Sequence, residues 1–525
     1  MLRNVIVLLA LGLVIGLPFL FKPKQNMLSR ADDTLVIISP HNEAIRYEFT
    51  HAFTEYYEKK TGRSVRLDWR IVGGTSEISR YLRSEYLAAF QYEWTEAGKK
   101  WTPQVAAAFD NPKPQEGEAL TARKAFLESN RGIGIDLFFG GGAYDFTKQA
   151  DAGRLVSSDI LKTHPEWFTK ESLPHLVSGE IFYDEKGRWI GNCLSSLGIC
   201  YNTDSLTRLK VSELPSSWKD LTNPRLLKQV ALADPTKSGS AAKAFEMVIQ
   251  QQMQEAVRNA GDESPKALAA GWEKGLQVIQ RASANARYFT DSAGKVPMDV
   301  SLGDAAIGMC IDFYGRYQSE AVKIDADSPA RLQYFTPVGG SSIGVDPIGL
   351  LRGAPNRKIA EMFIEFVLSI EGQKLWNFKV GAPGGPIRYA LRRMPVRKEL
   401  YEKQYSQYRS DPTVYPYEEA KGFDYHAAWT GPLFGAMSYI IRVMCLDPHQ
   451  EQAAAWKALI AADFPPEATK TFDDLSLVSY AFTKEKIRPA LRSADRLEEV
   501  RLAKNLGDQF REKYKNVIRL AREGK

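Results

Sequence analysis

The sequence contains few of the residues that build disulfide frameworks, metal centres and hydrolytic triads. Its 525 residues include four cysteines and six histidines. Four cysteines are too few for a disulfide scaffold, and no Cys and His residues have the spacing of a metal site. H-E-x-x-H, P-loop and Rossmann fingerprints are also absent. These absences predict that the protein is not an enzyme and needs no cofactor, and an enzyme is the main competing class.

The four cysteines are interpreted as small, buried apolar residues. Cys193 and Cys200 lie in a stretch that has the composition of an extended segment. A straight strand would separate them by roughly 23 Å, whereas a disulfide requires Cα atoms within about 7 Å. Only a hairpin between them would allow a bond, and Ser195-Ser196 is a weak turn signal. The sequence leaves open whether these two cysteines pair.

Chain length and charge limit the number of lobes and the kind of partner. A chain of 525 residues is longer than one hydrophobic core usually covers, so we expect two lobes or domains. With 69 basic and 63 acidic residues the net charge is +6. This excess is mild for the length and favours an anionic ligand or surface rather than nucleic acid. No internal repeat or low-complexity segment is present.

Residues 1–21 form a hydrophobic segment near the shortest length that spans a bilayer. Arg3 gives a thin positive flank, but no small-residue cleavage site follows. Residues 1–30 are therefore predicted to be either a signal peptide or an amino-terminal membrane anchor. Both interpretations export the rest of the chain.

The stretch from Gly303 to Tyr317 is the clearest candidate for a ligand site. Residues 305–311 form an apolar run typical of a buried strand, which stops at Asp312 and is followed by Phe313 and Tyr314. Ligands of α/β proteins bind beyond the carboxyl ends of strands. Asp312, Tyr314 and Tyr317 are therefore candidate ligand residues, although an ordinary strand-to-helix turn with packed aromatic residues has the same pattern.

Other predicted strands end in turns that precede a helix. The strand at residues 35–39 leads to His41 and Asn42, and the strand at 65–71 leads to Gly74, Thr75 and Ser76, of which Thr75 or Ser76 is the expected N-cap. Free amides and the helix dipole make such turns candidate anion sites, and plain capping is the alternative. The remaining candidates are Gly141, within the glycine triplet after residues 133–139, and Ser238, Gly239 and Ser240, after residues 229–233.

Two extended segments are predicted to cross between the lobes. They are residues 189–202 and 334–351. The predicted organisation is lobe 1 at residues 31–199, lobe 2 at 200–333, a return to lobe 1 at 334–400, and a helical extension packed on lobe 1 at 401–525. The last helix, with Leu506 and Phe510 on one face, fits either scaffold packing or a partner surface.

Several segments in the same order resemble the solute-binding proteins of bacterial ABC importers, in the cluster of ferric-ion-binding proteins. The resemblance is carried by residues 39–43, 136–139, 152–155, 191–202, 234–235, 238–240, 303–308, 346–350, 353–356 and 371–376. It implies an α/β periplasmic-binding-protein type II fold, with two lobes and two crossing strands that close over one ligand. It also implies a periplasmic monomer, secreted or anchored to the inner membrane, that delivers its ligand to an ABC permease.

The same resemblance implies an iron site whose residues are only partly present here. His41 matches the family's histidine, but the carboxylate position falls among residues 140–142, and the tyrosine pair reads Phe313-Tyr314. We therefore expect a small anionic solute, such as a sugar phosphate, phosphonate or carboxylate. Ferric iron held by His41 and Tyr314 is the alternative within the family. A membrane-anchored ligand sensor or adaptor is the alternative of another class.

Overall fold

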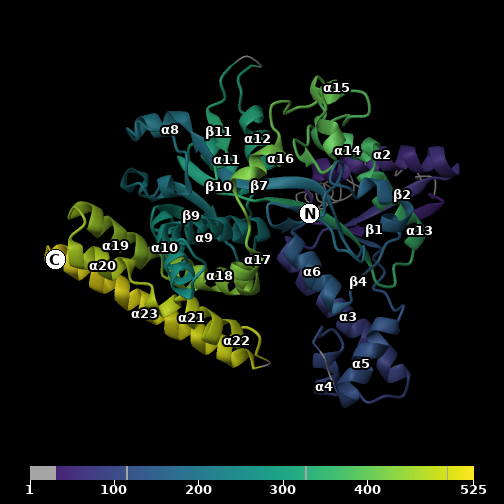
Figure 1. Ribbon diagram of the computed structural model, residues 1–525, viewed down its shortest axis with the longest axis horizontal. Helices are drawn as coiled ribbons and strands as arrows, with labels where there is room; N and C mark the ends of the chain where they lie inside the picture. The colour runs from purple at the N-terminus through teal and green to yellow at the C-terminus, as the bar shows by residue number, and fades with distance from the viewer. Residues whose placement is uncertain (1–30, 114–115, 326–327, 494, 525) are drawn as a thin grey trace, which may run out of the picture.

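The computed structural model describes residues 31–113, 116–325, 328–493 and 495–524 (Figure 1). The predicted signal peptide or anchor at residues 1–30 lies outside this range. Among the described residues, no helix combines the length and the apolar character that a membrane crossing requires.

One mixed sheet runs through both lobes. Its lobe 1 part contains β1 (Asp33–Ile38), β2 (Val65–Arg70), β3 (Leu137–Phe139), β4 (Leu155–Val156) and β12 (Ile343–Leu351). Its lobe 2 part contains β8 (Val230–Ala233), β9 (Ala286–Thr290), β10 (Ile307–Ile311) and β11 (Leu332–Phe335). With β7 (Ile190–Asn202) between the two parts, the main strand order is β2-β1-β3-β12-β7-β10-β8-β9. β13 (Met394–Pro395) also pairs with β7, and β5 (Leu176–Val177) forms a separate hairpin with β6 (Glu180–Ile181).

Strand β7 belongs to both lobes. Its first half, from Ile190 to Ser196, pairs antiparallel with β12, and its second half, from Leu197 to Tyr201, pairs antiparallel with β10. The first predicted crossing is therefore confirmed as one continuous strand. The second predicted crossing is divided, because β11 ends at Phe335 and β12 begins at Ile343. The expected α/β architecture with two lobes and two crossing segments is confirmed.

Helices cover the lobe 1 part of the sheet and bury its apolar side chains. Residues 93–132 contain two of these helices, α4 and α5. The lobe 1 helices are α2 (Glu43–Thr61), α3 (Thr75–Glu96), α4 (Pro103–Ala108), α5 (Gly117–Glu128), α6 (Ala143–Ala152), α7 (Ile160–Thr163), α13 (Arg357–Leu368) and α14 (Ile370–Asn377).

In lobe 2, α12 (Asp312–Ala321) starts directly where β10 ends, as predicted. The other lobe 2 helices are α8 (Thr203–Arg208), α9 (Gly239–Ala260), α10 (Pro265–Ala284) and α11 (Lys295–Leu302). Ser238 caps α9 through a hydrogen bond from the Ala241 amide to its hydroxyl, at 3.3 Å. In lobe 1 the predicted N-cap of α3 is wrong by one residue. Gly74 takes that place, and its amide donates to the Glu77 carboxylate at 2.9 Å.

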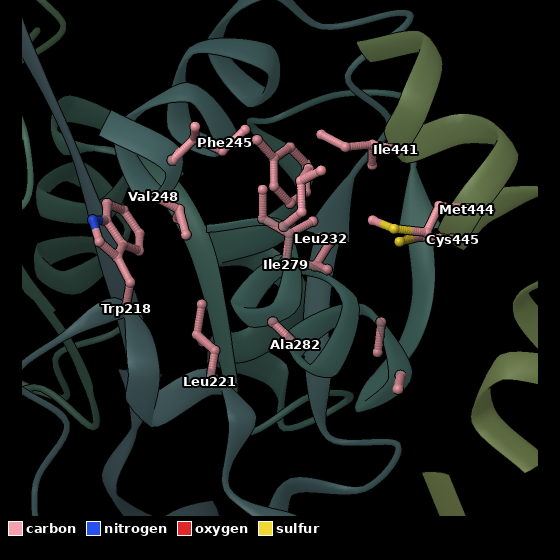
Figure 2. Close-up of a cluster of buried hydrophobic side chains, with 14 of the residues drawn as sticks. Trp218, Leu221, Leu232, Phe245, Val248, Ile279, Ala282, Ile441, Met444 and Cys445 are labelled. Atoms are coloured by element: carbon pink, nitrogen blue, oxygen red, sulfur yellow. The ribbon is translucent and has the colours of Figure 1, made fainter. Parts of the chain in front are cut away.

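The C-terminal extension packs on lobe 2, so the predicted packing on lobe 1 is wrong for most of it. Ile441, Met444 and Cys445 share a buried cluster with Phe245 and Ile279 of lobe 2 (Figure 2). Residues near 400–417 do pack on lobe 1. The helices of the extension are α15 (Lys403–Ser406), α16 (Pro416–Glu419), α17 (Ala427–Thr430), α18 (Phe434–Ile441), α19 (His449–Ala461), α20 (Pro466–Asp473), α21 (Tyr480–Phe482), α22 (Arg488–Ala490) and α23 (Arg496–Arg522).

The long helix α23 is scaffold, which decides between the two interpretations of the last helix. Its residues Leu506, Phe510, Tyr514 and Val517 are buried in the lobe 2 cluster. Figure 1 shows α23 lying along α19 and α20, with the C-terminus at the left of the view. The four cysteines are all buried and free, so Cys193 and Cys200 are not paired.

Replacing Phe510 by alanine tests the packing of α23. The ring is 0% exposed, and removing a buried aromatic ring typically costs about 3–5 kcal/mol. Urea unfolding is monitored by tryptophan fluorescence. We expect the urea concentration at the midpoint to fall in proportion to this loss of free energy. Val500→Ala is the matched control because Val500 is 62% exposed on the same helix. Equal midpoints for the two variants would contradict the packing described here.

Candidate functional site

The candidate residues gather where the two lobes meet. His41 follows β1 and Gly141 follows β3 in lobe 1, whereas Ser238 follows β8 and Tyr314 follows β10 in lobe 2. Each therefore lies beyond the carboxyl end of a strand, where α/β folds place their ligands.

The amino-terminal ends of three helices converge across the lobe boundary. A Cβ atom added at Gly239, the first residue of α9, would lie 4.0 Å from the Cβ of Thr75, the first residue of α3. One added at Gly141, just before α6, would lie 2.7 Å from the Thr75 Cγ2 atom, and one at Gly74 would lie 3.1 Å from the Lys237 carbonyl oxygen. The first amides of a helix have no intrahelical acceptor, and the helix dipole is positive at this end. The region between α3, α6 and α9 therefore suits an anion.

A carboxyl group borders the same region. The Asp145 Oδ2 atom would be 3.9 Å from a Cβ at Gly239, and its Oδ1 atom accepts a hydrogen bond from the Ser79 hydroxyl at 3.0 Å. Burial raises the pKa of Asp145, against the opposing effect of the Ser79 hydrogen bond. A protonated carboxyl group is a hydrogen-bond donor towards an anion, whereas a charged carboxylate repels one.

A second cluster, centred on Arg393, lies beside His41. The Arg393 Nη2 atom is 2.7 Å from the Asp346 Oδ2 atom, and its Nη1 atom is 3.4 Å from the His41 Nε2 atom. The guanidinium group lies over the Phe313 ring of lobe 2 at 4.1 Å and near the Trp376 ring of lobe 1 at 5.5 Å. Arg393 therefore joins the two lobes at the place where His41 was expected to contact a ligand.

Charge compensation explains how this cluster is tolerated in the interior. Burial lowers the pKa of His41, so the imidazole is neutral at pH 7. Burial opposes ionisation of Asp346, but Arg393 and His41 together hold its pKa below the ordinary value. The pair formed by Asp346 and Arg393 is thus ionised and balanced, as a buried ion pair must be.

The structure gives different surroundings to the other predicted residues. The carboxylate of Asp312, a candidate ligand residue, accepts a hydrogen bond from the Phe313 amide at 2.8 Å and is paired with Arg316. Asn42 caps α2 by accepting from the Ile45 amide at 3.1 Å. Tyr314 is half-buried at the boundary, whereas Tyr317 is 46% exposed. Ser76 and Ser240 occupy the second positions of α3 and α9, and ligand contact by any of these residues stays a prediction.

The surroundings of His41 and Tyr314 bear on the alternative of ferric iron as cargo. Among the described parts of the chain, no three or more His, Cys, Asp and Glu side chains are grouped to hold a metal ion. The Arg393 guanidinium is 3.4 Å from His41 Nε2 and repels a cation there.

Sequence reasoning missed Arg393, Asp346 and Asp145 as members of the site. Asp346 lies in a segment that carried the family resemblance, and Asp145 follows the glycine triplet, so both had a weak local signal. Arg393 had none, because its partner His41 is 352 positions away in the chain.

A serine pattern typical of hydrolases is also present, at Gly340, Ser342 and Gly344, which have G-x-S-x-G spacing. A nucleophile of this class lies on a sharp strand-to-helix turn with its hydroxyl exposed. Ser342 instead is buried just before strand β12, and its hydroxyl donates to the Glu180 Oε1 atom at 2.6 Å. This surrounding does not match a nucleophile elbow.

The pH dependence of stability tests the buried, neutral His41. The unfolded chain binds a proton at this residue near pH 6.5, whereas the folded chain binds it only at lower pH. Stability therefore falls as the pH drops below about 6.5. We expect the Tm of His41→Gln to fall less steeply than that of the wild type between about pH 6.5 and 5. Asp346 does not affect the comparison between pH 6.5 and 5. Its pKa is lowered in the folded protein, so the stability that its charged form provides is lost only as the pH falls below about 3.8.

His51 supplies the control for this experiment, because 42% of its side chain is exposed. His51→Gln removes a surface imidazole and controls for the loss of a histidine side chain as such. Identical slopes for the wild type and His41→Gln would contradict a neutral, buried imidazole.

Replacing Arg393 tests its buried ion pair with Asp346. Arg393→Met leaves Asp346 as an unpaired buried charge, which typically costs about 3–5 kcal/mol. The double variant Arg393→Met with Asp346→Asn should recover part of this loss in urea unfolding. Arg357→Met, which breaks a surface pair with Glu361, should change stability by less than about 1 kcal/mol. Additive losses in the double variant would contradict the pairing.

Comparison with known proteins identifies the family. The family model for bacterial extracellular solute-binding proteins matches residues 134–395. An uncharacterized protein of Haemophilus influenzae is 26% identical over 266 residues, and the match covers 50% of this chain and 66% of that relative, just under two thirds of its length.

Two similar solved structures are periplasmic proteins. One is the periplasmic binding protein AfuA of Actinobacillus pleuropneumoniae with exogenous fructose-6-phosphate bound, at 18% identity and a TM-score of 0.47, covering 70% of this chain and 86% of that one. The other is iron-bound HitA of Pseudomonas aeruginosa, at 16% identity and a TM-score of 0.46, covering 77% and 98%. On the match of the family model, which spans the crossing strands and the whole of lobe 2, this chain belongs to the family of bacterial extracellular solute-binding proteins.

Proposed function

We propose that this protein is the extracytoplasmic solute-binding component of an ABC importer. It captures a small anionic solute, such as a sugar phosphate, phosphonate or carboxylate, between its two lobes and delivers it to a permease in the inner membrane. The family supports capture and transport in the periplasm. The proposal that the solute is an anion rests on one observation, the convergence of the amino-terminal ends of α3, α6 and α9 at the lobe boundary.

Contributions from both lobes favour this region as the place of capture. Thr75 and Gly141 belong to lobe 1, and Gly239 and Ser240 belong to lobe 2. A ligand bonded to amides of both lobes stabilises the arrangement in which the lobes meet, because only that arrangement satisfies all of its contacts. Gly141 allows the close approach of α3 to this turn, since a Cβ at Gly141 would collide with the Thr75 Cγ2 atom at 2.7 Å.

Thermal unfolding against a panel of solutes tests this proposal. The panel contains sugar phosphates, phosphonates, dicarboxylates and ferric complexes. A ligand at a hundredfold excess over its Kd stabilises the folded state by about 2.7 kcal/mol. We expect an anionic organic solute to raise the Tm by several degrees. We also expect Ser240→Asp to remove the shift, because it places a carboxylate at the amino-terminal end of α9.

A matched control separates repulsion of the ligand from an effect on folding. Lys266→Asp places a carboxylate at the same position of α10, the second residue of that helix, and should keep the ligand-induced shift. A shift caused by ferric complexes and lost in Tyr314→Phe would instead support iron as the cargo. A shift that survives Ser240→Asp would rule out the α9 end as the binding site.

A further inference from the structure

Residues 417–434 of the C-terminal extension pass from lobe 1 to lobe 2. We call this segment the strap. On the lobe 1 side, the Tyr417 hydroxyl donates to the Val396 carbonyl at 2.5 Å, and the Tyr425 amide donates to the Ser178 carbonyl at 2.8 Å. Ser178 lies in the turn between β5 and β6. The strap is thus a third connection between the lobes, besides the two crossing segments.

On the lobe 2 side the strap is bonded to helix α9. The Gln250 side-chain amide donates to the His426 carbonyl at 2.9 Å and to the Thr430 hydroxyl at 2.7 Å. The Gln254 amide donates to the Asp424 carbonyl at 2.8 Å. Because side chains of a single helix bond successive points of the strap, the strap cannot leave lobe 2 without losing all of these bonds together.

A cluster of charged side chains lies between the strap and the two lobes. The Lys243 Nζ atom of α9 is 2.8 Å from the Glu180 Oε1 atom of β6 in lobe 1 and 2.9 Å from the Glu246 Oε2 atom of α9. It also lies 3.7 Å from the centre of the Tyr425 ring of the strap. Glu180 and Glu246 are 7% and 0% exposed. The only cation among these three charges therefore holds a carboxylate from each lobe.

Hydroxyl groups complete the bonding of both carboxylates. The Tyr425 and Thr430 hydroxyls donate to the Glu246 Oε1 atom at 2.8 and 2.6 Å. The Ser342 hydroxyl, in the segment before β12, donates to the Glu180 Oε1 atom at 2.6 Å. Coulombic attraction in a buried site is much stronger than in water, and removing one partner leaves an uncompensated charge. Separation of the lobes at this point would break the pair between Lys243 and Glu180 and leave Glu180 without its cation, whereas Lys243 would keep Glu246 of its own helix.

We infer that the strap and the cluster of Glu180, Lys243 and Glu246 fasten the two lobes together in the absence of solute. Closure is then a property of the chain and does not need a bound ligand. This inference goes beyond the proposed function, because it concerns the arrangement of the lobes whether or not a solute is captured. A solute then reaches the amino-terminal ends of α3, α6 and α9 when residues at the lobe boundary move locally, and the lobes do not open widely.

Distance measurement between spin labels on the two lobes tests the inference. Labels are attached at Tyr92→Cys in α3 and Leu302→Cys at the end of α11, positions that are 50% and 69% exposed. The native cysteines are buried and do not compete for the label. After exhaustive dialysis and with no solute added, we expect one narrow distance distribution.

Two variants release the fastening, and one leaves it intact. Glu180→Gln removes the lobe 1 charge with little change of shape, and Lys243→Met removes the shared cation. In each we expect a second population at longer distance. Lys219→Met breaks an exposed pair with Glu255 and should keep the narrow distribution. Should Lys243→Met fail to fold, Glu180→Gln alone decides.

Two outcomes would overturn the inference. One is a broad or double distribution in the wild type without solute, and the other is an unchanged narrow distribution in the folded Glu180→Gln variant. Binding of the solutes is measured as a change in Tm, whereas the fastening of the lobes is measured as the distance between spin labels. A failure of solute binding is therefore separate from a failure of the fastening.

Discussion

Strand β7 is the constraint on which the arrangement of the two lobes depends. All 13 of its residues are buried, and it supplies hydrogen bonds to β12 in one half and to β10 in the other. An unpaired amide or carbonyl group inside the protein is costly, so the strand cannot slip along either neighbour. The lobes therefore meet in one register. That register brings the turns after β1 and β3 opposite the turns after β8 and β10.

The lobe boundary contains several buried ion pairs, each balanced within itself. Arg393 is paired with Asp346, Arg316 with Asp312, and Lys243 with Glu180 and Glu246. Removal of such charges from water is expensive, and well-packed apolar residues would often be as stable. Arg393 and Asp346 both belong to lobe 1, and Asp312 and Arg316 both belong to α12, so of these pairs only Lys243 with Glu180 depends on how the two lobes are arranged.

The Arg393 cluster also changes where a solute is expected. The resemblance implies a ligand beside His41 and the pair Phe313-Tyr314. In the structure a guanidinium group of the chain itself lies against His41 and over Phe313. A second cation at this point would be repelled, whereas the helix ends at Thr75, Gly141 and Gly239 lie close together and carry the positive ends of their helix dipoles. The anionic alternative is therefore the one that the surrounding charges favour.

The sequence by itself determined the features that depend on neighbouring residues. The end of a buried strand at Asp312, the burial of the four cysteines and the apolar face of the last helix follow from local periodicity and from residue type. The turns that collect the candidate site were identifiable for the same reason, since each strand end and helix start has its own local signal.

Only the tertiary structure decided which surfaces meet. An apolar face predicts that a helix is buried but not against which partner, so the sequence predicts packing on lobe 1, whereas most of the extension packs on lobe 2. The charged pairs were equally hidden, because Arg393 and His41 are 352 positions apart and Ser342 and Glu180 are 162 positions apart. Contacts over such distances depend on how whole elements pack, and no local pattern of residues encodes them.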